Sequence, residues 1–414
     1  ERMIATRKTI KAISIFTAGI CTILFVTILY YQFYLPESYT VDAGENLSLA
    51  SPTISASQSQ DQTESVAQKN QKKEMLNLWG IFPIKEVAVQ SCEPVTLVPS
   101  GNPFGIKMFT EGAMVVGFSP ILTEEGNRYP GKEAGLKEGD TILKINGKEI
   151  SRNEEAAFLI EESRGKPLCF TIKRGKETKE YTVNPVLSVG ENTYKTGILI
   201  RDSAAGIGTI TYVDPSTNVF GGLGHAICDI DTGEILSVGS GEVCEVEVHN
   251  IHRGEKGNPG ELLGAFTSNT PMGTIVNNNE TGIYGQLFDS HLSGDSSAKA
   301  YPMARKQEVK PGKATILCRL NNDSVEEYDI QITSIDYNPK NKIKNMVIKV
   351  TDDELLELTG GIVQGMSGTP ILQNGKLVGA VTHVFVNNPE KGFGIFAENM
   401  YENSKKIEAY EEAS

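Results

Sequence analysis

The most apolar part of the chain lies close to its N-terminus. Four basic residues lie in the first eleven positions and the next charged residue is Glu37, so Ile13–Leu35 is a long uncharged run. As a helix, this run can cross the roughly 30 Å hydrocarbon layer of a bilayer. The basic flank keeps the N-terminus in the cytoplasm, which predicts an anchor over residues 1–36 and export of the remainder. A cleaved signal peptide is the alternative, although no small-x-small site directly follows the run.

A polar stretch follows the apolar run. No aromatic residue occurs between Tyr39 and Trp79, and Asp42–Lys73 consists largely of Ser, Gln, Thr, Asn and Ala. Such a segment cannot bury enough apolar surface to offset its ordering entropy. The composition predicts a mobile tether, within a lead-in over residues 37–94, that is open to proteolytic cleavage.

Short strand-like runs, turns and one helical stretch fill residues 95–185. We expect the helix at Asn153–Glu162, followed by strands near Leu168–Lys173 and Thr178–Val183. Between Ala134 and Gly147 the chain reads Ala-Gly-Leu-Lys-Glu-Gly-Asp-Thr-Ile-Leu-Lys-Ile-Asn-Gly. This run resembles the signature of PDZ domains, and its final Asn-Gly suits a primed hairpin turn.

The PDZ resemblance implies a peptide-binding groove. Its carboxylate-binding loop is expected at Phe104, Gly105, Ile106 and Lys107. Backbone N–H groups of such a loop hold a chain terminus or an internal turn while the ligand adds a strand to the sheet. A structural β-domain that binds no ligand is the alternative.

From Val186 onward, short apolar runs alternate with Gly, Asn, Asp and Pro, and a helix is expected near Ala397–Tyr410. Frequent turns favour a sandwich or barrel over a parallel α/β sheet. The 414 residues, 39% of them apolar, are enough for several packed domains. A net charge of -13 without a basic face argues against a nucleic-acid partner. The six cysteines show no CxxC spacing and predict no disulfide scaffold.

The strongest chemical signal is a serine between glycines. Gly365–Pro370 reads Gly-Met-Ser-Gly-Thr-Pro, and an Asn-Gly turn follows between two strand-like runs. The pattern looks like the nucleophile loop of chymotrypsin-like serine peptidases. Glycines let the backbone turn tightly and expose the Ser367 hydroxyl. By this resemblance, the amides of Gly365 and Ser367 would form the oxyanion hole. A serine in an ordinary glycine-rich turn is the alternative.

A serine hydroxyl requires a base, and the chain has five histidines. His225 follows a strand-like run and lies in a glycine-rich loop, where another segment can approach closely. His383 alternates with apolar neighbours on a strand after the serine, so it either lines a substrate pocket or packs. His249 and His252 are interpreted as parts of a solvated loop, and His291 has no supporting context.

A third residue would orient the imidazole and stabilise its charged form. Asp352 lies fifteen residues before the serine at a strand end, with Asp353 beside it, whereas Asp229 is four residues after the histidine. Spacing alone does not choose among these three aspartates.

The motifs together resemble one family. The anchor, the PDZ signature, the Gly-His-x-Ile-x-Asp loop at His225 and the run Thr359–Pro370 look like the stage IV sporulation protein B family of endospore-forming Firmicutes. Carried over by position, that family's catalytic triad falls on His225, Asp352 and Ser367. The short interval between the aspartate and the serine departs from the usual chymotrypsin-like layout.

The resemblance also implies a biological role. Members are secreted from the forespore into the space between the two membranes, cleave themselves near the N-terminus and then cut a membrane-bound regulatory partner. An intramembrane protease is released, and a late mother-cell sigma factor is processed. The resemblance implies that the PDZ domain helps in self-recognition and substrate targeting.

The sequence therefore predicts a mainly β serine endopeptidase that uses neither metal nor organic cofactor. We expect a PDZ domain over residues 95–185 and a chymotrypsin-like double β-barrel domain over residues 186–414, after the transmembrane helix. The main alternative is a membrane-anchored PDZ scaffold whose protease-like domain binds peptide without cutting it. A broad quality-control protease fits less well, because its PDZ domain usually follows the catalytic domain.

Overall fold

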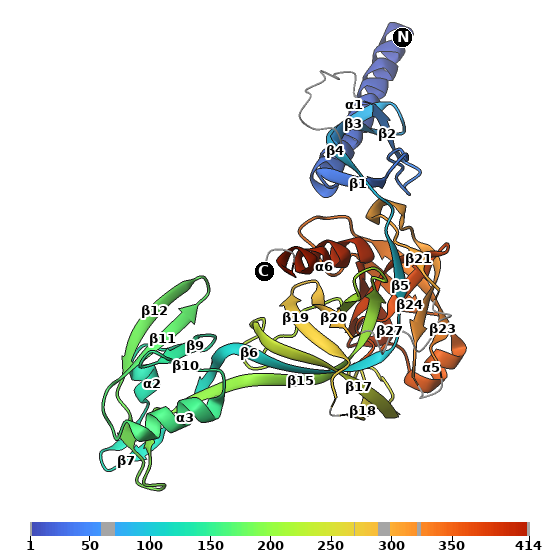
Figure 1. Ribbon diagram of the computed structural model, residues 1–414. Coiled ribbons are helices and arrows are strands. Elements are labelled where there is room, and N and C mark those ends of the chain that lie inside the picture. The colour runs from blue at the N-terminus through green and yellow to red at the C-terminus, as the bar shows by residue number, and fades with distance from the viewer. Residues whose placement is uncertain (1, 59–70, 269, 289–298, 321–323, 412–414) are drawn as a thin grey trace.

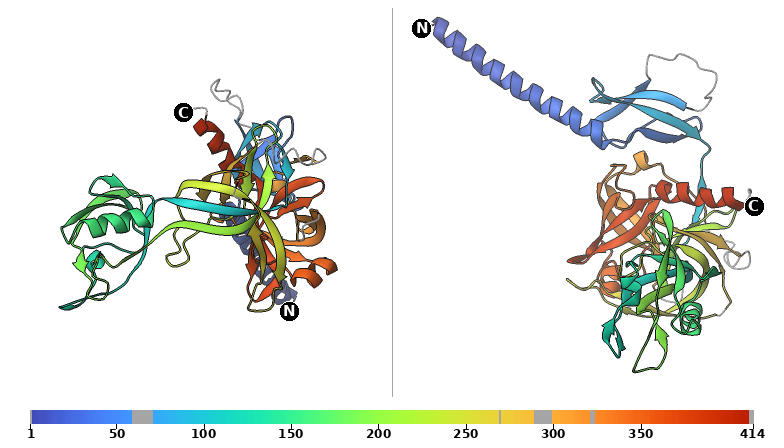
Figure 2. Two further views of the ribbon diagram at one scale, coloured as in Figure 1. Left: turned by 60° about the horizontal axis from the view of Figure 1, so that its bottom comes forward. Right: turned by 90° about the vertical axis from the view of Figure 1, so that its left-hand side faces the viewer.

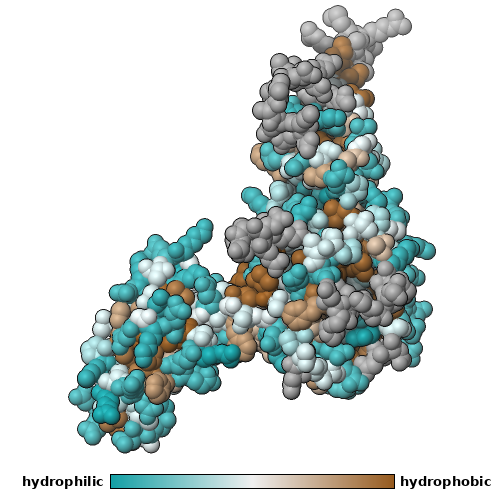
Figure 3. Space-filling view, viewed as in Figure 1, coloured by the Kyte–Doolittle hydropathy of each residue, from teal (hydrophilic) through white to brown (hydrophobic). Residues whose placement is uncertain are grey.

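The structure is a computed structural model that describes residues 2–58, 71–268, 270–288, 299–320 and 324–411. Its first element is the helix α1 (Arg2–Tyr34), which projects from the rest of the molecule (Figure 1). The 25 residues Ile10–Tyr34 are long and apolar enough to cross a membrane. Apolar side chains lie along α1 at the top of Figure 3, whereas polar residues cover most of the other visible surface.

A small sheet follows α1. Its strands pair in the order β1 (Ser38–Asp42), β4 (Phe82–Cys92), β3 (Gln71–Leu78), β2 (Ile54–Gln58). The expectation of a mobile tether over Asp42–Lys73 is therefore wrong for the described part of that segment. The prediction relied on the polar composition of the whole segment. It overlooked the few apolar residues, Leu47 and Ile54 among them, that pack onto buried side chains of β3 and β4.

The next strands form a first barrel. They include β6 (Pro103–Phe118), β15 (Ile198–Val213), β16 (Val219–Gly222), β17 (Val238–His252), β19 (Gly273–Asn279) and β20 (Gly282–Leu287). Pairing runs β6-β17-β19-β20-β16-β15 and returns from β15 to β6, which closes a six-stranded ring that we call barrel 1. Its interior is packed by buried side chains such as Phe104, Phe220 and Val243. The short strands β5 (Thr96–Pro99), β18 (Glu261–Phe266) and β21 (Tyr301–Pro302) extend it.

The PDZ module grows out of barrel 1 rather than preceding it. The second half of β6 and the first half of β15 leave the barrel as a ribbon and pair with further strands away from it (Figures 1 and 2). The module contains β7 (Ile121–Thr123), β8 (Gly126–Arg128), α2 (Pro130–Glu133), β9 (Thr141–Ile145), β10 (Lys148–Glu149), α3 (Asn153–Glu162), β11 (Leu168–Arg174), β12 (Glu177–Val183), β13 (Val186–Leu187) and β14 (Tyr194–Lys195). The predicted helix and strands of this module are confirmed, and Asn146-Gly147 turns with positive φ at both residues.

The C-terminal half forms a second closed barrel, barrel 2. Its strands pair in the order β22 (Gly312–Cys318), β23 (Glu326–Ile335), β24 (Met346–Val350), β27 (Asn388–Phe396), β26 (Lys376–Phe385), β25 (Pro370–Gln373). The helices η1 (Lys306–Glu308), α5 (Asp353–Thr359) and α6 (Ala397–Glu411) accompany it. Two barrels, each of six strands, confirm the predicted chymotrypsin-like architecture. The first barrel, however, begins near residue 96, so the PDZ module is inserted within the peptidase fold.

Candidate active site

Ser367 lies in a tight loop between α5 and β25. Gly365 and Gly368 flank it with φ values of +95° and +96°, a region that other residues rarely adopt. A Cβ atom on Gly368 would lie 2.0 Å from the carbonyl oxygen of Thr209 on β15. The glycine at 368 is therefore required for barrel 1 to approach the serine loop of barrel 2.

Barrel 1 holds this loop by hydrogen bonds from β15. The Thr209 N–H donates to the carbonyl of Ser367 at 2.9 Å, and the Thr209 hydroxyl donates to the carbonyl of Gly365 at 2.8 Å. Two residues along, the Thr211 hydroxyl donates to the carbonyl of Gly368 at 2.7 Å. Sequence reasoning missed both threonines, although their spacing of two placed them on one face of a predicted strand.

The serine loop also presents two backbone donors. Among the described residues, no hydrogen bond starts from the N–H of Gly365 or of Ser367, while the carbonyls of both accept bonds from Thr209. Unpaired backbone N–H groups at a tight turn are what a developing oxyanion would use. The oxyanion hole expected at Gly365 and Ser367 stays a prediction, and these two N–H groups have no acceptor in the described structure.

His225 lies directly after β16 on the glycine-rich loop. Its Nδ1 atom is 2.8 Å from the carbonyl oxygen of Ala226. A carbonyl only accepts, so in the neutral ring Nδ1 carries the hydrogen and Nε2 keeps its lone pair. Burial lowers the pKa of His225, against the opposing effect of the Ala226 carbonyl, so the imidazole is neutral at pH 7.

His383 on β26 lies beside His225. The two ring centroids are 4.8 Å apart at an interplanar angle of 40°. Burial first, then the charges of His225 and Lys344, lower the pKa of His383 to about 4. Its Nδ1 atom is buried without a hydrogen-bond partner. The histidine that competed with His225 in the sequence thus belongs to the same cluster.

The serine hydroxyl meets this cluster at β26. Ser367 Oγ donates to the carbonyl oxygen of Thr382 at 2.8 Å, one residue before His383. Next to His225, a Cβ on Gly224 would lie 2.9 Å from the Thr382 side chain. The structure therefore places His225, His383 and Ser367 in one region where the two barrels meet, and the hydroxyl bond described for Ser367 goes to Thr382 rather than to a histidine.

Asp352 does not join them in this conformation. It is the N-cap of α5, where one carboxylate oxygen accepts from the Leu355 N–H at 3.0 Å and the other from the Asp329 N–H at 3.2 Å. The described structure gives no hydrogen bond or ion pair between Asp352 and His225. The expected orienting contact is thus not made, because one oxygen of Asp352 caps α5 and the other accepts from the Asp329 N–H of β23.

The other candidates serve elsewhere. Asp229 is buried and pairs with Arg201, and it accepts from the backbone N–H groups of Asp231 and Thr232. Asp353 is exposed in the first turn of α5. His249 is exposed on β17, His252 lies 3.5 Å from Glu261, and the expectation for His291 falls outside the described residues.

The expected PDZ loop is misplaced. Phe104, Gly105, Ile106 and Lys107 lie inside β6, paired with β15 on one side and with β17 on the other. Phe104 is fully buried in the core of barrel 1. A strand paired on both edges cannot accept a ligand strand, so the expectation for these four residues is wrong.

An open edge exists instead on the PDZ part of β15. Residues Ile198–Arg201 pair with β6 and with no other described strand, Asp202 lies at a register shift, and α3 contacts β15. The N–H of Asn153, at the start of α3, donates to buried Asp202 at 2.8 Å. Thr196 and Gly197 precede this edge, and their N–H groups donate no hydrogen bond among the described residues. The run Gly-Ile-Leu-Ile that begins at Gly197 is the sequence pattern that could have located this loop.

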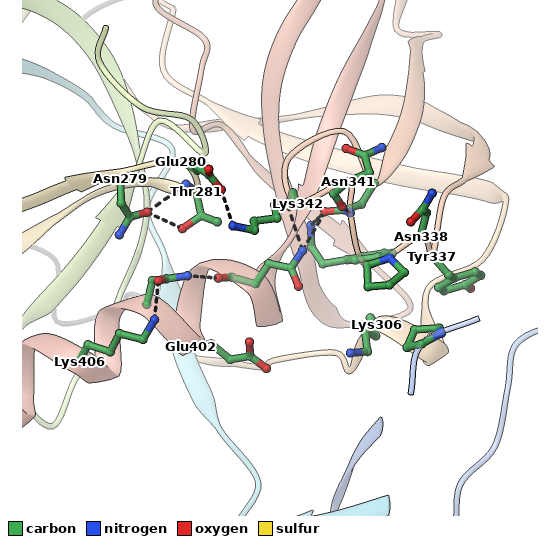
Figure 4. Close-up of a pocket in the computed structure, with 16 residues that line it drawn as sticks. Asn279, Glu280, Thr281, Lys306, Tyr337, Asn338, Asn341, Lys342, Glu402 and Lys406 are labelled. Carbon is green, nitrogen blue, oxygen red and sulfur yellow. Dashed lines mark hydrogen bonds and ion pairs between the residues drawn. The ribbon is translucent and has the colours of Figure 1, made fainter. Parts of the chain in front are cut away.

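A separate pocket lies away from this cluster. Its volume is about 500 Å³, and it opens between α6, the β19–β20 turn and the segment before β24 (Figure 4). Amide and charged side chains line it, including Asn279, Asn341, Lys342 and Glu402. None of the three clustered residues contributes to its lining.

Comparison with known proteins identifies the family. A family model described as SpoIVB peptidase S55 matches residues 192–401, just over half of the chain. The chain belongs to this peptidase family. Both His225 and Ser367 of the S55 peptidase lie within the matched range, and a PDZ domain model separately matches residues 123–174.

Curated relatives match only in part. The "Probable protease eep" of Enterococcus faecalis is 38% identical over 56 residues, and the "Putative zinc metalloprotease CPE1693" of Clostridium perfringens is 33% identical over 69 residues. The matches cover 14% and 17% of this S55 peptidase, and 13% and 20% of the relatives' own lengths.

Solved structures are also similar in part. The PDZ domain of the SdrC-like protein from Listeria monocytogenes, 19% identical, covers 22% of this chain and 87% of its own, with a TM-score of 0.18. The active form of the Rv3671c protease from M. tuberculosis, 15% identical, covers 49% and 74%, with a TM-score of 0.28. TM-scores this low carry no argument about the fold. The assignment of two barrels to the S55 peptidase therefore depends only on its own strand pairing.

Proposed function

We propose that this chain is a membrane-anchored serine endopeptidase in which His225 is the general base and Ser367 the nucleophile. The observation that carries the proposal is the meeting of the neutral His225 ring, the Ser367 loop and two unpaired N–H groups between the barrels. A nucleophile, a base and oxyanion donors are the parts that acyl transfer requires.

The reaction follows from these parts. His225 Nε2 takes the proton of Ser367 as its oxygen attacks the scissile carbonyl, which requires the hydroxyl to turn away from Thr382. The N–H groups of Gly365 and Ser367 stabilise the oxyanion. His225 then gives its proton to the leaving amine, and water hydrolyses the acyl-enzyme by the same steps.

The Ala226 carbonyl takes over part of the role that an aspartate has in a catalytic triad, which is to orient the histidine. By accepting from Nδ1–H of His225, it fixes the ring and the tautomer. A neutral carbonyl stabilises an imidazolium less than a carboxylate does. We therefore propose a slow, dyad-like peptidase in this conformation, and a triad only if Asp352 leaves its cap and reaches the histidine.

We propose that the β15 edge presents protein substrates. An extended peptide can add to Ile198–Asp202 beside α3, with its end or an internal turn held by the N–H groups at Thr196 and Gly197. The free edge and the free donors support this assignment.

The family resemblance extends the proposal to sporulation signalling. The peptidase would act between the forespore and mother-cell membranes, cut itself near the N-terminus and then cut a membrane-bound regulator. That cut would permit intramembrane proteolysis and late sigma-factor activation. No described residue identifies the bond that is cut.

The test measures self-cleavage of a protein that contains both α1 and the exported region, kept in solution by detergent. We compare the wild type with Ser367→Ala, His225→Ala and Ser216→Ala, the last being a serine bonded to Asp214 outside the cluster. Shortening and fluorophosphonate labelling should vanish in the first two variants and persist in the third.

A second function competes, namely that of a peptide-binding scaffold. It is favoured by one observation, the hydrogen bond of Ser367 to a backbone carbonyl rather than to a histidine. If the wild type neither shortens nor labels while binding peptide at the β15 edge, the peptidase proposal fails and the scaffold stands.

A further inference from the structure

The small N-terminal sheet packs against the helix that can span a membrane. Leu24, Ile28, Tyr31 and Tyr34 of α1 contact the core formed by β1, β2, β3 and β4. All four lie within the apolar segment Ile10–Tyr34. The sheet therefore lies beside the C-terminal part of that segment (Figure 2).

The boundary between the apolar segment of α1 and the polar chain after it is marked by Lys85. Its Nζ atom donates to the carbonyls of Gln32 and Leu35 at the end of α1, at 3.2 and 2.9 Å, and pairs with Glu37. A lysine ammonium stays at the polar edge of a bilayer while its stem covers apolar surface. At 1.5 Å per residue, Ile10–Tyr34 is about 37 Å long, more than the roughly 30 Å hydrocarbon layer.

The β3–β4 hairpin extends back along α1 from this boundary. β4 runs parallel to β1, and Ser38 pairs with Ala88, so the residues before Ala88 lie on the side from which α1 arrives. A surface hollow lined by Phe33 of α1 and Pro83 of β4 confirms that the two segments are neighbours.

The hairpin tip, Trp79–Ile81, carries two large apolar side chains and is exposed. Trp79 is 59% exposed and Ile81 is 72% exposed. The Trp79 N–H donates to the carbonyl of Thr53 at 2.7 Å, and the turn has positive φ at Trp79 and Gly80. The folded turn thus holds these two side chains outward. Polar residues could occupy the same exposed positions at no cost in packing, so the packing of the sheet does not explain the apolar ones.

Charge is absent from the tip and its surroundings. No Asp, Glu, Lys or Arg occurs in residues 75–84, or in residues 46–58 that lead into the neighbouring strand β2. In the ladder, Leu78 pairs with Phe82 and Leu76 with Lys85, so the tip projects past Lys85. An uncharged tip with a tryptophan suits the membrane interface, where indole rings concentrate.

We propose that the hairpin tip inserts into the interface of the bilayer that α1 crosses, with Trp79 and Ile81 among the lipid headgroups and upper acyl chains. The inference rests on the proposed anchoring by α1. The sheet is docked on the peptidase fold by Arg305, which pairs with Asp42 at 2.6 Å and is only 6% exposed. Two membrane contacts rather than one would therefore hold the barrels at a fixed orientation above the lipid.

The chain supplies its own probe, because Trp79 is its single tryptophan. The full chain is reconstituted in phosphatidylcholine–phosphatidylglycerol vesicles, and its emission is measured with acyl-brominated lipids and with aqueous acrylamide. We expect brominated lipids to quench most of the Trp79 emission and acrylamide to quench little. Bromine near the headgroup end of the acyl chain should act more strongly than bromine near its methyl end.

A matched variant moves the probe. In Trp79→Phe with Phe158→Trp, the tryptophan lies on the PDZ helix α3, where residue 158 is 63% exposed. Its emission should resemble that of tryptophan in water and respond to acrylamide alone. Equal quenching of both proteins by brominated lipid would reveal general adsorption and overturn the proposal.

Alkaline carbonate extraction separates failure of the hairpin contact from failure of the anchor. Retained protein with acrylamide-accessible Trp79 would overturn the hairpin contact and leave the anchor intact. Extraction of the protein from the vesicles would overturn both. Retention with lipid quenching that is lost in Ile81→Asp would support the insertion.

Discussion

The backbone N–H of Thr209 donates a hydrogen bond of 2.9 Å to the carbonyl of Ser367, so a strand of barrel 1 holds the serine loop of barrel 2. The strand is β15, whose first residues, Ile198–Asp202, form the open edge of the PDZ module. A peptide added at that edge and the loop that carries the serine therefore contact one continuous strand. We expect the two sites to influence each other through it.

The first prediction removes one hydroxyl from this contact. Thr209→Val keeps the shape but leaves the Gly365 carbonyl without its side-chain donor. Because a small displacement of a nucleophile is costly, kcat/KM on a short peptide substrate should fall about tenfold to a hundredfold. Thr209→Ser, which keeps the hydroxyl, should stay close to the wild type. Equal activity of the two variants would show that the contact does not position the loop.

The second prediction concerns the link between the PDZ ribbon and the histidine loop. Arg201 on β15 pairs with buried Asp229 and, at 2.8 Å, with Asp231. Arg201→Met would leave the Asp229 charge without its partner, so the loop after His225 should shift. We expect kcat/KM to fall at least about tenfold, as for other losses of alignment.

Arg174 provides the matched control for this pair. Arg174 also binds a buried aspartate, Asp140, but within the PDZ module and away from the histidines. Arg174→Met should lower thermal stability to a similar degree while leaving cleavage of a short peptide unchanged. If both variants lose activity equally, general destabilisation explains the effect and no specific link exists.

The third prediction separates two roles of Asp352. Serine is a good N-cap, so Asp352→Ser should keep α5 and most of the activity. Asp352→Ala should lose about 1 kcal/mol of stability, which lowers the melting temperature by ~2–4 °C. A fall in kcat as deep as that of Ser367→Ala, in the folded serine variant, would show that the cap opens in the active enzyme and that Asp352 orients His225.

Local sequence patterns predicted individual helices and turns better than they predicted which strands and side chains meet in the fold. The Asn-Gly pair at Asn374 turns a hairpin with positive φ at both residues, as expected. The helix Asn153–Glu162 also has the expected bounds. Such features depend on neighbouring residues, which a sequence displays directly.

Long-range relationships were harder to predict. Phe104 lies near the start of β6, a strand that belongs partly to barrel 1 and partly to the PDZ module, and nothing in the run Phe104–Lys107 marks where barrel 1 ends. The edge after Gly197 lies far along the chain from the PDZ signature. Asp352 had the right residue type for a triad, but an aspartate before a helix is equally a cap, and only packing decides.

The final prediction concerns pH. As general base, His225 must be neutral, so activity falls as pH drops through its pKa. Burial lowers that pKa, which displaces the fall to below the ordinary histidine value of about 6.5. The acidic limb of kcat/KM, measured on a short peptide substrate, should therefore lie below pH ~6.5. His383 has a pKa of about 4, so it stays neutral over most of the pH range in which the activity falls. The variant His383→Asn should therefore keep the acidic limb of the kcat/KM profile. A limb at or above the ordinary value would mean that water reaches His225 in the working enzyme, and would contradict the buried base.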